Sequence, residues 1–135
     1  MTVTSLSLQN VRRYASNARH YLDNGLVFLR SGDTAKSGEF LWGSIAEALK
    51  AVAASRGIHL ASHSGLRRFA TALAREEEDA SLVEGVHMAE SLHSNFYETE
   101  LEAQDIVPVV DSIRRTLEKL FALIPEQALE ETSAS

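Results

Sequence analysis

The residues with the clearest chemical potential gather in the stretch 81–101, which reads SLVEGVHMAESLHSNFYETEL. Its central histidine, His93, can take up or release a proton near neutral pH, and the polar side chains around it can orient a ligand through hydrogen bonds. We therefore predict one binding cleft. Its candidate residues are Glu90, His93, Asn95 and Tyr97 from this stretch and His63 from an earlier part of the chain.

The spacing of apolar residues in this stretch predicts a helix with a single buried face. At about 100° per residue, one side collects Leu82, Val86, Ala89, His93 and Phe96. His93 should therefore face inward, either as a hydrogen-bonded core residue or as the floor of a site between helices, and His87 should face water. Asn95 and Tyr97 fall on opposite flanks of the buried face, so they can border one cleft without binding the same atom.

Two Glu-x-x-His units in this helix suggest a metal site at first sight. Di-iron carboxylate bundles take such units from different helices, so that both point at one centre. Here Glu84 with His87 and Glu90 with His93 share one helix and are rotated by about 240° from each other. The five histidines lack the tight spacing of zinc ligands, and the chain has no cysteine. We predict no metal site and no bound cofactor.

Length and composition describe one compact globular unit. The chain has 135 residues, 44% of them apolar, with only 2 Pro and 7 Gly. No run approaches the roughly 18 apolar residues of a membrane span, and the N-terminal residues do not resemble a signal peptide. We expect a cytoplasmic protein with no membrane partner. The net charge of -6 argues against broad, non-specific binding of nucleic acids.

Apolar residues recur at three- and four-residue steps through most of the chain, which predicts helices. The predicted helices cover about 5–30, 34–56, 64–77, 81–101 and 109–124, with a turn at 103–108. The fold class is an all-α antiparallel bundle of about five helices. We predict one domain at 1–125 and a flexible acidic tail at 126–135. In the first helix, an aromatic ridge suited to packing on another helix is formed by Tyr14, Tyr21 and Phe28.

The second helix, 34–56, is apolar or small over most of its circumference and should be the central helix. One polar line runs along it, and on this line Glu47 and Lys50 are placed to pair at the surface. Trp42 supplies bulk to the core. We add Trp42 and Lys50 to the candidate cleft residues.

Three stretches carry a family resemblance: EFLWGSIAEALKAVAASRG, SHSGL and LHSNFYE. Through them the chain resembles the HEPN superfamily of small helical domains, and more closely its archaeal PaREP-like branch, over roughly residues 14–123. The resemblance implies an antiparallel helical bundle that often forms homodimers. Many HEPN proteins are metal-independent ribonucleases with an Arg, a gap of four to six residues and a His, whereas others bind nucleotides or accompany nucleotidyltransferases.

The ribonuclease pattern is matched only in part. By the resemblance, His93 matches the HNFYE-like histidine of the PaREP-like branch, but the positions where the ribonuclease arginine would stand hold Val86, His87 and Met88. Arg56 and His63 have the right spacing, yet they lie on either side of a connector and Arg56 is followed by Gly57 instead of a polar residue. We therefore expect a non-catalytic binding or assembly role, as a homodimer, with a nucleotide, RNA or a protein as partner. The alternative is a metal-independent ribonuclease that uses His93.

Overall fold

The computed structural model describes residues 5–94 and 102–130. These residues form six helices and no strand: α1 (Ser5–Arg30), α2 (Thr34–Ser55), α3 (His63–Glu76), α4 (Ser81–Ser94), α5 (Ala103–Ala122) and α6 (Glu126–Leu129). The prediction of an all-α bundle with five substantial helices is confirmed. Within the described ranges, no helix combines the length and hydropathy that crossing a membrane requires.

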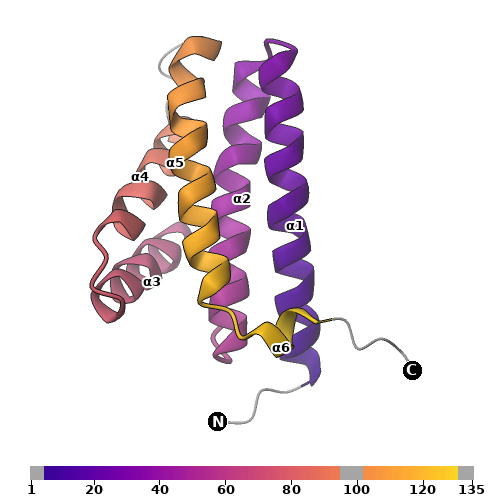
Figure 1. Cartoon of the computed structure of the whole chain (residues 1–135), viewed down its shortest axis with the longest axis vertical. Coiled ribbons are helices and arrows are strands. Elements are labelled where there is room, and N and C mark those ends of the chain that lie inside the picture. The colour runs from indigo at the N-terminus through magenta and orange to yellow at the C-terminus, as the bar shows by residue number, and fades with distance from the viewer. Residues whose placement is uncertain (1–4, 95–101, 131–135) are drawn as a thin grey trace.

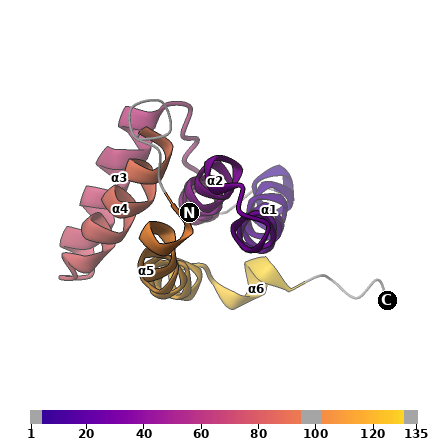
Figure 2. The same ribbon diagram turned by 90° about the horizontal axis from the view of Figure 1, so that it is seen from above.

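The helices are arranged around α2. Three long helices, α1, α2 and α5, run side by side, and the shorter α3 and α4 form a tilted pair beside them (Figure 1). Seen from above, α1 and the α3–α4 pair lie on opposite sides of α2 (Figure 2). Because α2 contacts α1, α3, α4 and α5, the prediction that the second helix is central is confirmed.

A tight turn makes α1 and α2 antiparallel, as the sequence predicts. Gly32 adopts a φ of 85°, a conformation that glycine takes without strain. Asp33 then caps α2, since its side chain accepts a 3.1 Å hydrogen bond from the backbone N–H of Lys36. Beside the turn, the rings of Phe28 and Phe40 stack with their centroids 5.5 Å apart.

The phase predicted for α4 is confirmed at four positions, whereas His93, which was predicted to face inward, is half-buried. Leu82, Val86 and Ala89 are buried, and His87 is exposed. The remainder of the predicted helix, including Phe96, lies outside the described residues.

The predicted turn at 103–108 is wrong, because α5 begins at Ala103. The backbone N–H of Glu102 donates a 3.0 Å hydrogen bond to the Asp105 carboxylate, which stabilises the start of the helix ahead of the proline. Pro108 is exposed near the N-terminal end of α5, where its missing N–H removes a single helical hydrogen bond.

The first residues of the predicted tail form α6. This short helix contacts α1, and Ala128 is buried there. The carbonyl oxygen of Ala128 accepts a 3.3 Å hydrogen bond from Arg12 Nε. An apolar anchor and a polar contact thus fix this segment beside α1. The end of the predicted tail, 131–135, lies outside the described residues.

Candidate functional site

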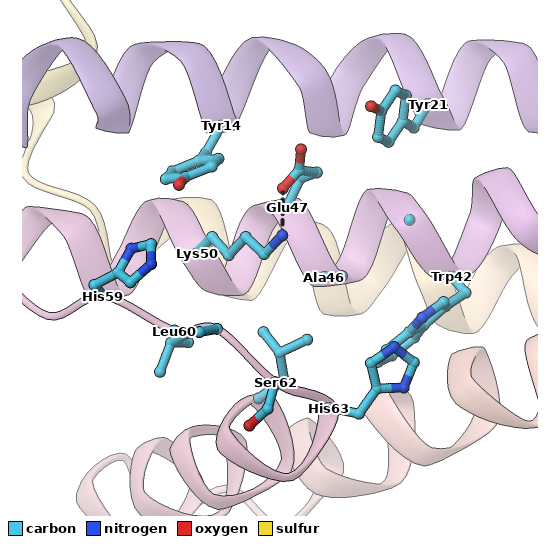
Figure 3. Close-up of a pocket in the computed structure, with 13 residues that line it drawn as sticks. Tyr14, Tyr21, Trp42, Ala46, Glu47, Lys50, His59, Leu60, Ser62 and His63 are labelled. Atoms are coloured by element: carbon cyan, nitrogen blue, oxygen red, sulfur yellow. Dashed lines mark ion pairs between the residues drawn. The ribbon is translucent and has the colours of Figure 1, made fainter.

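A pocket of about 660 Å³ opens between α1, α2 and the connector that leads into α3. Figure 3 shows side chains from these three segments around it. Its walls carry aromatic rings, an ammonium group, a carboxylate and two imidazoles, supplied by Tyr14, Tyr21, Trp42, Glu47, Lys50, His59 and His63. Pockets of this volume hold small molecules, so this is the candidate binding site.

Two tyrosines form the α1 side of the pocket. Tyr14 and Tyr21 are seven residues apart, so they share one face of the helix. The Tyr21 ring lies against Gly43, where an added Cβ would stand only 3.1 Å from it. Its edge also meets Phe40, with the ring centroids 5.6 Å apart. The predicted aromatic ridge therefore packs on α2 of the same chain.

Glu47 is buried in the pocket wall, which corrects the prediction that it lies at the surface. The residue is 9% exposed, because α1 covers this side of α2. Its Oε1 accepts a 3.0 Å hydrogen bond from Asn17 Nδ2. Its Oε2 lies 3.4 Å from the ammonium group of Lys50 but has no hydrogen-bond partner among the described residues.

Lys50 extends along the pocket toward this carboxylate (Figure 3). The predicted pair with Glu47 is confirmed, although it lies in the pocket wall. The Lys50 ammonium is also 5.9 Å from the centre of the Tyr14 ring. Because 32% of the Lys50 side chain is exposed, solvent screens the pair and its contribution to stability is small.

His63 connects the pocket to the cluster predicted on α4. The hydroxyl of Ser62 caps α3 and thereby fixes His63 in its first turn. The His63 ring centroid lies 5.5 Å from that of Trp42 and 5.6 Å from that of His93. Its Nδ1 is 3.9 Å from Glu90 Oε2. We call His63, Glu90 and His93 the histidine cluster; the structure brings these predicted residues together, with Trp42 at one end.

Arg67, which sequence analysis did not select, is the main partner of Glu90. Its guanidinium donates a 3.0 Å hydrogen bond to the same Oε2 that faces His63. This ion pair ties α3 to α4.

His93 is half-buried at the end of the cluster, while His87 on the same helix is exposed.

Sequence analysis also considered Asn95, Tyr97 and Arg56. Asn95 and Tyr97 lie outside the described residues. Arg56, which has the ribonuclease spacing to His63, pairs through both guanidinium nitrogens with Glu76, at 2.9 and 3.1 Å. Within 5–94 and 102–130, no group of three or more histidines, cysteines or acidic residues is arranged to hold a metal ion.

A second lysine–carboxylate pair lies away from the pocket, where α4 begins. Lys119 Nζ donates a 2.7 Å hydrogen bond to Asp79 Oδ2, and the backbone N–H of Ser81 donates one of 3.0 Å to Oδ1. The hydrogen bond from Lys119, followed by that from the Ser81 hydroxyl, holds the pKa of Asp79 below its ordinary value. Asp79 is therefore stabilised in its charged form.

Sequence analysis missed the α1 side of the pocket. It assigned Tyr14 and Tyr21 to packing and treated His59 as part of a connector. One feature of the sequence did indicate a site there. Two of the three aromatic residues in the ridge are tyrosines, and their hydroxyl groups favour a polar environment over a fully apolar core. The sequence did not show which turn of α1 would stand opposite Glu47 and Lys50.

A family model describing the archaeal PaREP1/PaREP8 family matches residues 13–117. The chain belongs to this family. The resemblance to the PaREP-like branch is therefore confirmed. The matched range contains every residue that lines the candidate pocket. The family description names neither a ligand nor a reaction. Comparison with curated proteins and with solved structures found no match.

Proposed function

We propose that this PaREP1/PaREP8 chain is a non-catalytic, HEPN-like binding domain of the cytoplasm, and that its pocket binds a nucleotide. The observation that carries the proposal is the mixed lining of the pocket, in which two tyrosine rings line the same cavity as Lys50, His59 and His63. Aromatic rings stack on nucleobases, and ammonium and imidazolium groups bind phosphates. Both parts of a nucleotide therefore find complementary groups in one cavity.

A single nucleotide suits this pocket better than a long RNA strand. Affinity for a strand depends on a positive surface that neutralises many phosphates, whereas this chain has a net charge of -6. The pocket offers one lysine and two histidines, enough for one phosphate group. We therefore rank RNA and protein partners below a nucleotide.

The pairing of two arginines with carboxylates supports a non-catalytic role. Phosphodiester cleavage without a metal needs proton transfer and a cation that stabilises charge on the phosphate. Arg67 is paired with Glu90, and Arg56 is paired with Glu76. We infer that both guanidinium groups serve helix packing.

One observation favours the ribonuclease alternative: the His63 and His93 rings are 5.6 Å apart, so one could act as base and the other as acid. Incubating the protein with labelled structured and single-stranded RNA in EDTA tests this alternative. We expect no cleavage above background. Cleavage that disappears in His93→Ala would make the ribonuclease the better interpretation.

Equilibrium dialysis against labelled AMP, GMP and CMP tests nucleotide binding. We expect Lys50→Met to weaken binding about tenfold, because a hydrogen bond to a charged group is lost. Lys36→Met is the matched control, since Lys36 lies on the same helix but over the Phe28 ring, outside the pocket. Failure of all three nucleotides to bind the unaltered protein would refute the proposal.

We also propose a homodimer, as the HEPN resemblance implies. The aromatic ridge packs within the chain, and the exposed large apolar side chains lie on four different segments, so the resemblance alone supports the dimer; these side chains are Val27, Ile58, Met88 and Val107. Light scattering at micromolar concentration should give twice the mass of one chain. A mass of one chain would reject the dimer.

A further inference from the structure

The Glu47 carboxylate is incompletely satisfied inside the chain. Its Oε2 is the one buried side-chain nitrogen or oxygen in the described residues that has no hydrogen-bond partner. A buried acceptor without a donor costs free energy, so native proteins rarely keep one without a reason. Because Glu47 lies in the wall of the candidate pocket, a ligand can supply the missing donor.

At present Lys50 covers this oxygen. Its Nζ lies 3.4 Å away, close enough for an ion pair but without hydrogen-bond geometry. The Lys50 side chain is partly exposed, and its flexible four-carbon stem can turn about several bonds. Lys50 can therefore leave Glu47 when a stronger partner for the ammonium group enters the pocket.

A smaller cavity of about 80 Å³ adjoins the pocket on the side of His59. The two cavities share Tyr14, Lys50, His59 and Leu60. The smaller one is also lined by Asn10, whose amide can donate hydrogen bonds. Lysine, imidazole and amide donors around a small volume are complementary to a phosphate group.

We propose that ligand binding exchanges the ion pair of the pocket: Lys50 turns from Glu47 to a phosphate beside His59, and an amino group on the ligand's base donates to Glu47 Oε2. The exchange rests on the proposed nucleotide-binding function and narrows its ligand class. That class is a nucleoside 5′-monophosphate whose base carries an exocyclic amino group. No covalent bond forms or breaks.

Because of this exchange, the phosphate and the base of the ligand each bind well only when the other is present. A phosphate alone draws Lys50 away and leaves the buried Glu47 Oε2 without a compensating charge or donor, which is unfavourable. A base alone must compete with Lys50 for Glu47. Only a molecule that carries both groups satisfies Lys50 and Glu47 at once.

The fluorescence of Trp42 tests the exchange, because Trp42 lines the pocket and is the single tryptophan of the chain. The ligands are AMP, purine riboside 5′-monophosphate (AMP without its amino group), adenosine and inorganic phosphate. AMP should bind at least about tenfold more tightly than each of the others.

The variant Glu47→Gln should produce a gain as well as a loss. Without the carboxylate, Lys50 is free, so inorganic phosphate should bind several-fold more tightly than to the unaltered protein. The preference for AMP over purine riboside monophosphate should disappear. Glu39→Gln, an exposed position on the same helix, removes one charge outside the pocket and should change neither affinity.

The outcomes separate this inference from the function on which it rests. Equal binding of AMP and purine riboside monophosphate to the unaltered protein overturns the exchange but leaves nucleotide binding in place. Weaker phosphate binding by Glu47→Gln, with its thermal unfolding unchanged, also overturns the exchange. If AMP, GMP and CMP all fail to bind, both proposals fall.

Discussion

Two lysine–carboxylate pairs in this fold differ in how completely the chain satisfies them. At the start of α4, Asp79 receives hydrogen bonds from Lys119 and from both the backbone and the hydroxyl of Ser81. In the pocket, Glu47 Oε2 faces Lys50 at 3.4 Å without a hydrogen bond. The first pair is complete and fastens α5 to the start of α4, whereas the second is left open to a further partner.

The packing beside the two pairs also differs. Beyond Asp79, α4 and α5 approach so closely that a Cβ added at Gly85 would stand 1.9 Å from Thr116 Oγ1. Around Glu47, the helices and the connector leave a pocket of about 660 Å³. The contrast is one of degree, because a smaller pocket of about 300 Å³ borders Ser81, Gly85 and Lys119. Lys119 is fixed by its hydrogen bond to Asp79, and Lys50 has no such bond to Glu47 Oε2.

The largest expected effect is that of Gly85→Ala. The new methyl group overlaps Thr116, so α4 and α5 must separate, and overpacking of this kind costs about 1–3 kcal/mol. Urea denaturation should show this loss. The double variant with Thr116→Ala should recover part of the stability.

Gly43→Ala is the matched substitution on the pocket side. Its methyl group meets the Tyr21 ring at 3.1 Å, and this ring borders open space into which it can shift. The loss of stability should be smaller than for Gly85→Ala. Equal losses would contradict the expectation that the Tyr21 ring shifts more easily than the buried Thr116 side chain.

The next effect concerns the dependence of stability on pH. The folded state lowers the pKa of Asp79, so the unfolded chain binds this proton at higher pH than the folded one. The carboxylate therefore stabilises the fold above its ordinary pKa of about 4, and this contribution is lost as the pH falls through the lower, folded value. Asp79→Asn should reduce Tm at pH 7, and the difference from the unaltered protein should shrink below about pH 4.

Thermal unfolding at several pH values checks this prediction. Asp111→Asn on α5 is a suitable control, because Asp111 is exposed and its substitution also removes one negative charge. A Tm difference for Asp79→Asn that stayed constant from pH 7 to acid would show that the Lys119 contact does not depend on the charge of Asp79.

The smallest effects separate two histidines on α4. His93→Ala should destabilise the fold or weaken ligand binding, because its ring packs on His63 beside the pocket. His87→Ala should change stability by less than about 0.5 kcal/mol, since surface substitutions rarely do more. Denaturation and AMP titration of both variants measure this difference. Similar losses in both would mean that the His93 contact contributes nothing specific.

Periodicity within one helix was a reliable guide to the fold. The phase of α4 placed Leu82 inside and His87 outside, and the small residues of α2 identified the central helix. The start of α5 was mispredicted because Pro108 was taken to require the first turn of a helix. In the structure, the contact between Glu102 and Asp105 starts the helix earlier.

The sequence predicted the residues of the candidate site whose position does not depend on the register of one helix against another. Sequence analysis selected Trp42, Lys50 and His63, which line the pocket, but it put Glu47 at the surface. Burial of Glu47 depends on which turn of α1 covers α2. That register is set by contacts such as Tyr21 on Gly43, and no single-helix pattern contains it.

A crystal structure of the protein with AMP would show the proposed ion-pair exchange in the pocket itself. We predict that AMP lies in the pocket, with its phosphate bound by Lys50 near His59 and its amino group on Glu47 Oε2. The Lys50–Glu47 pair should be broken. AMP bound elsewhere, or bound in the pocket with Lys50 still on Glu47, would contradict this prediction.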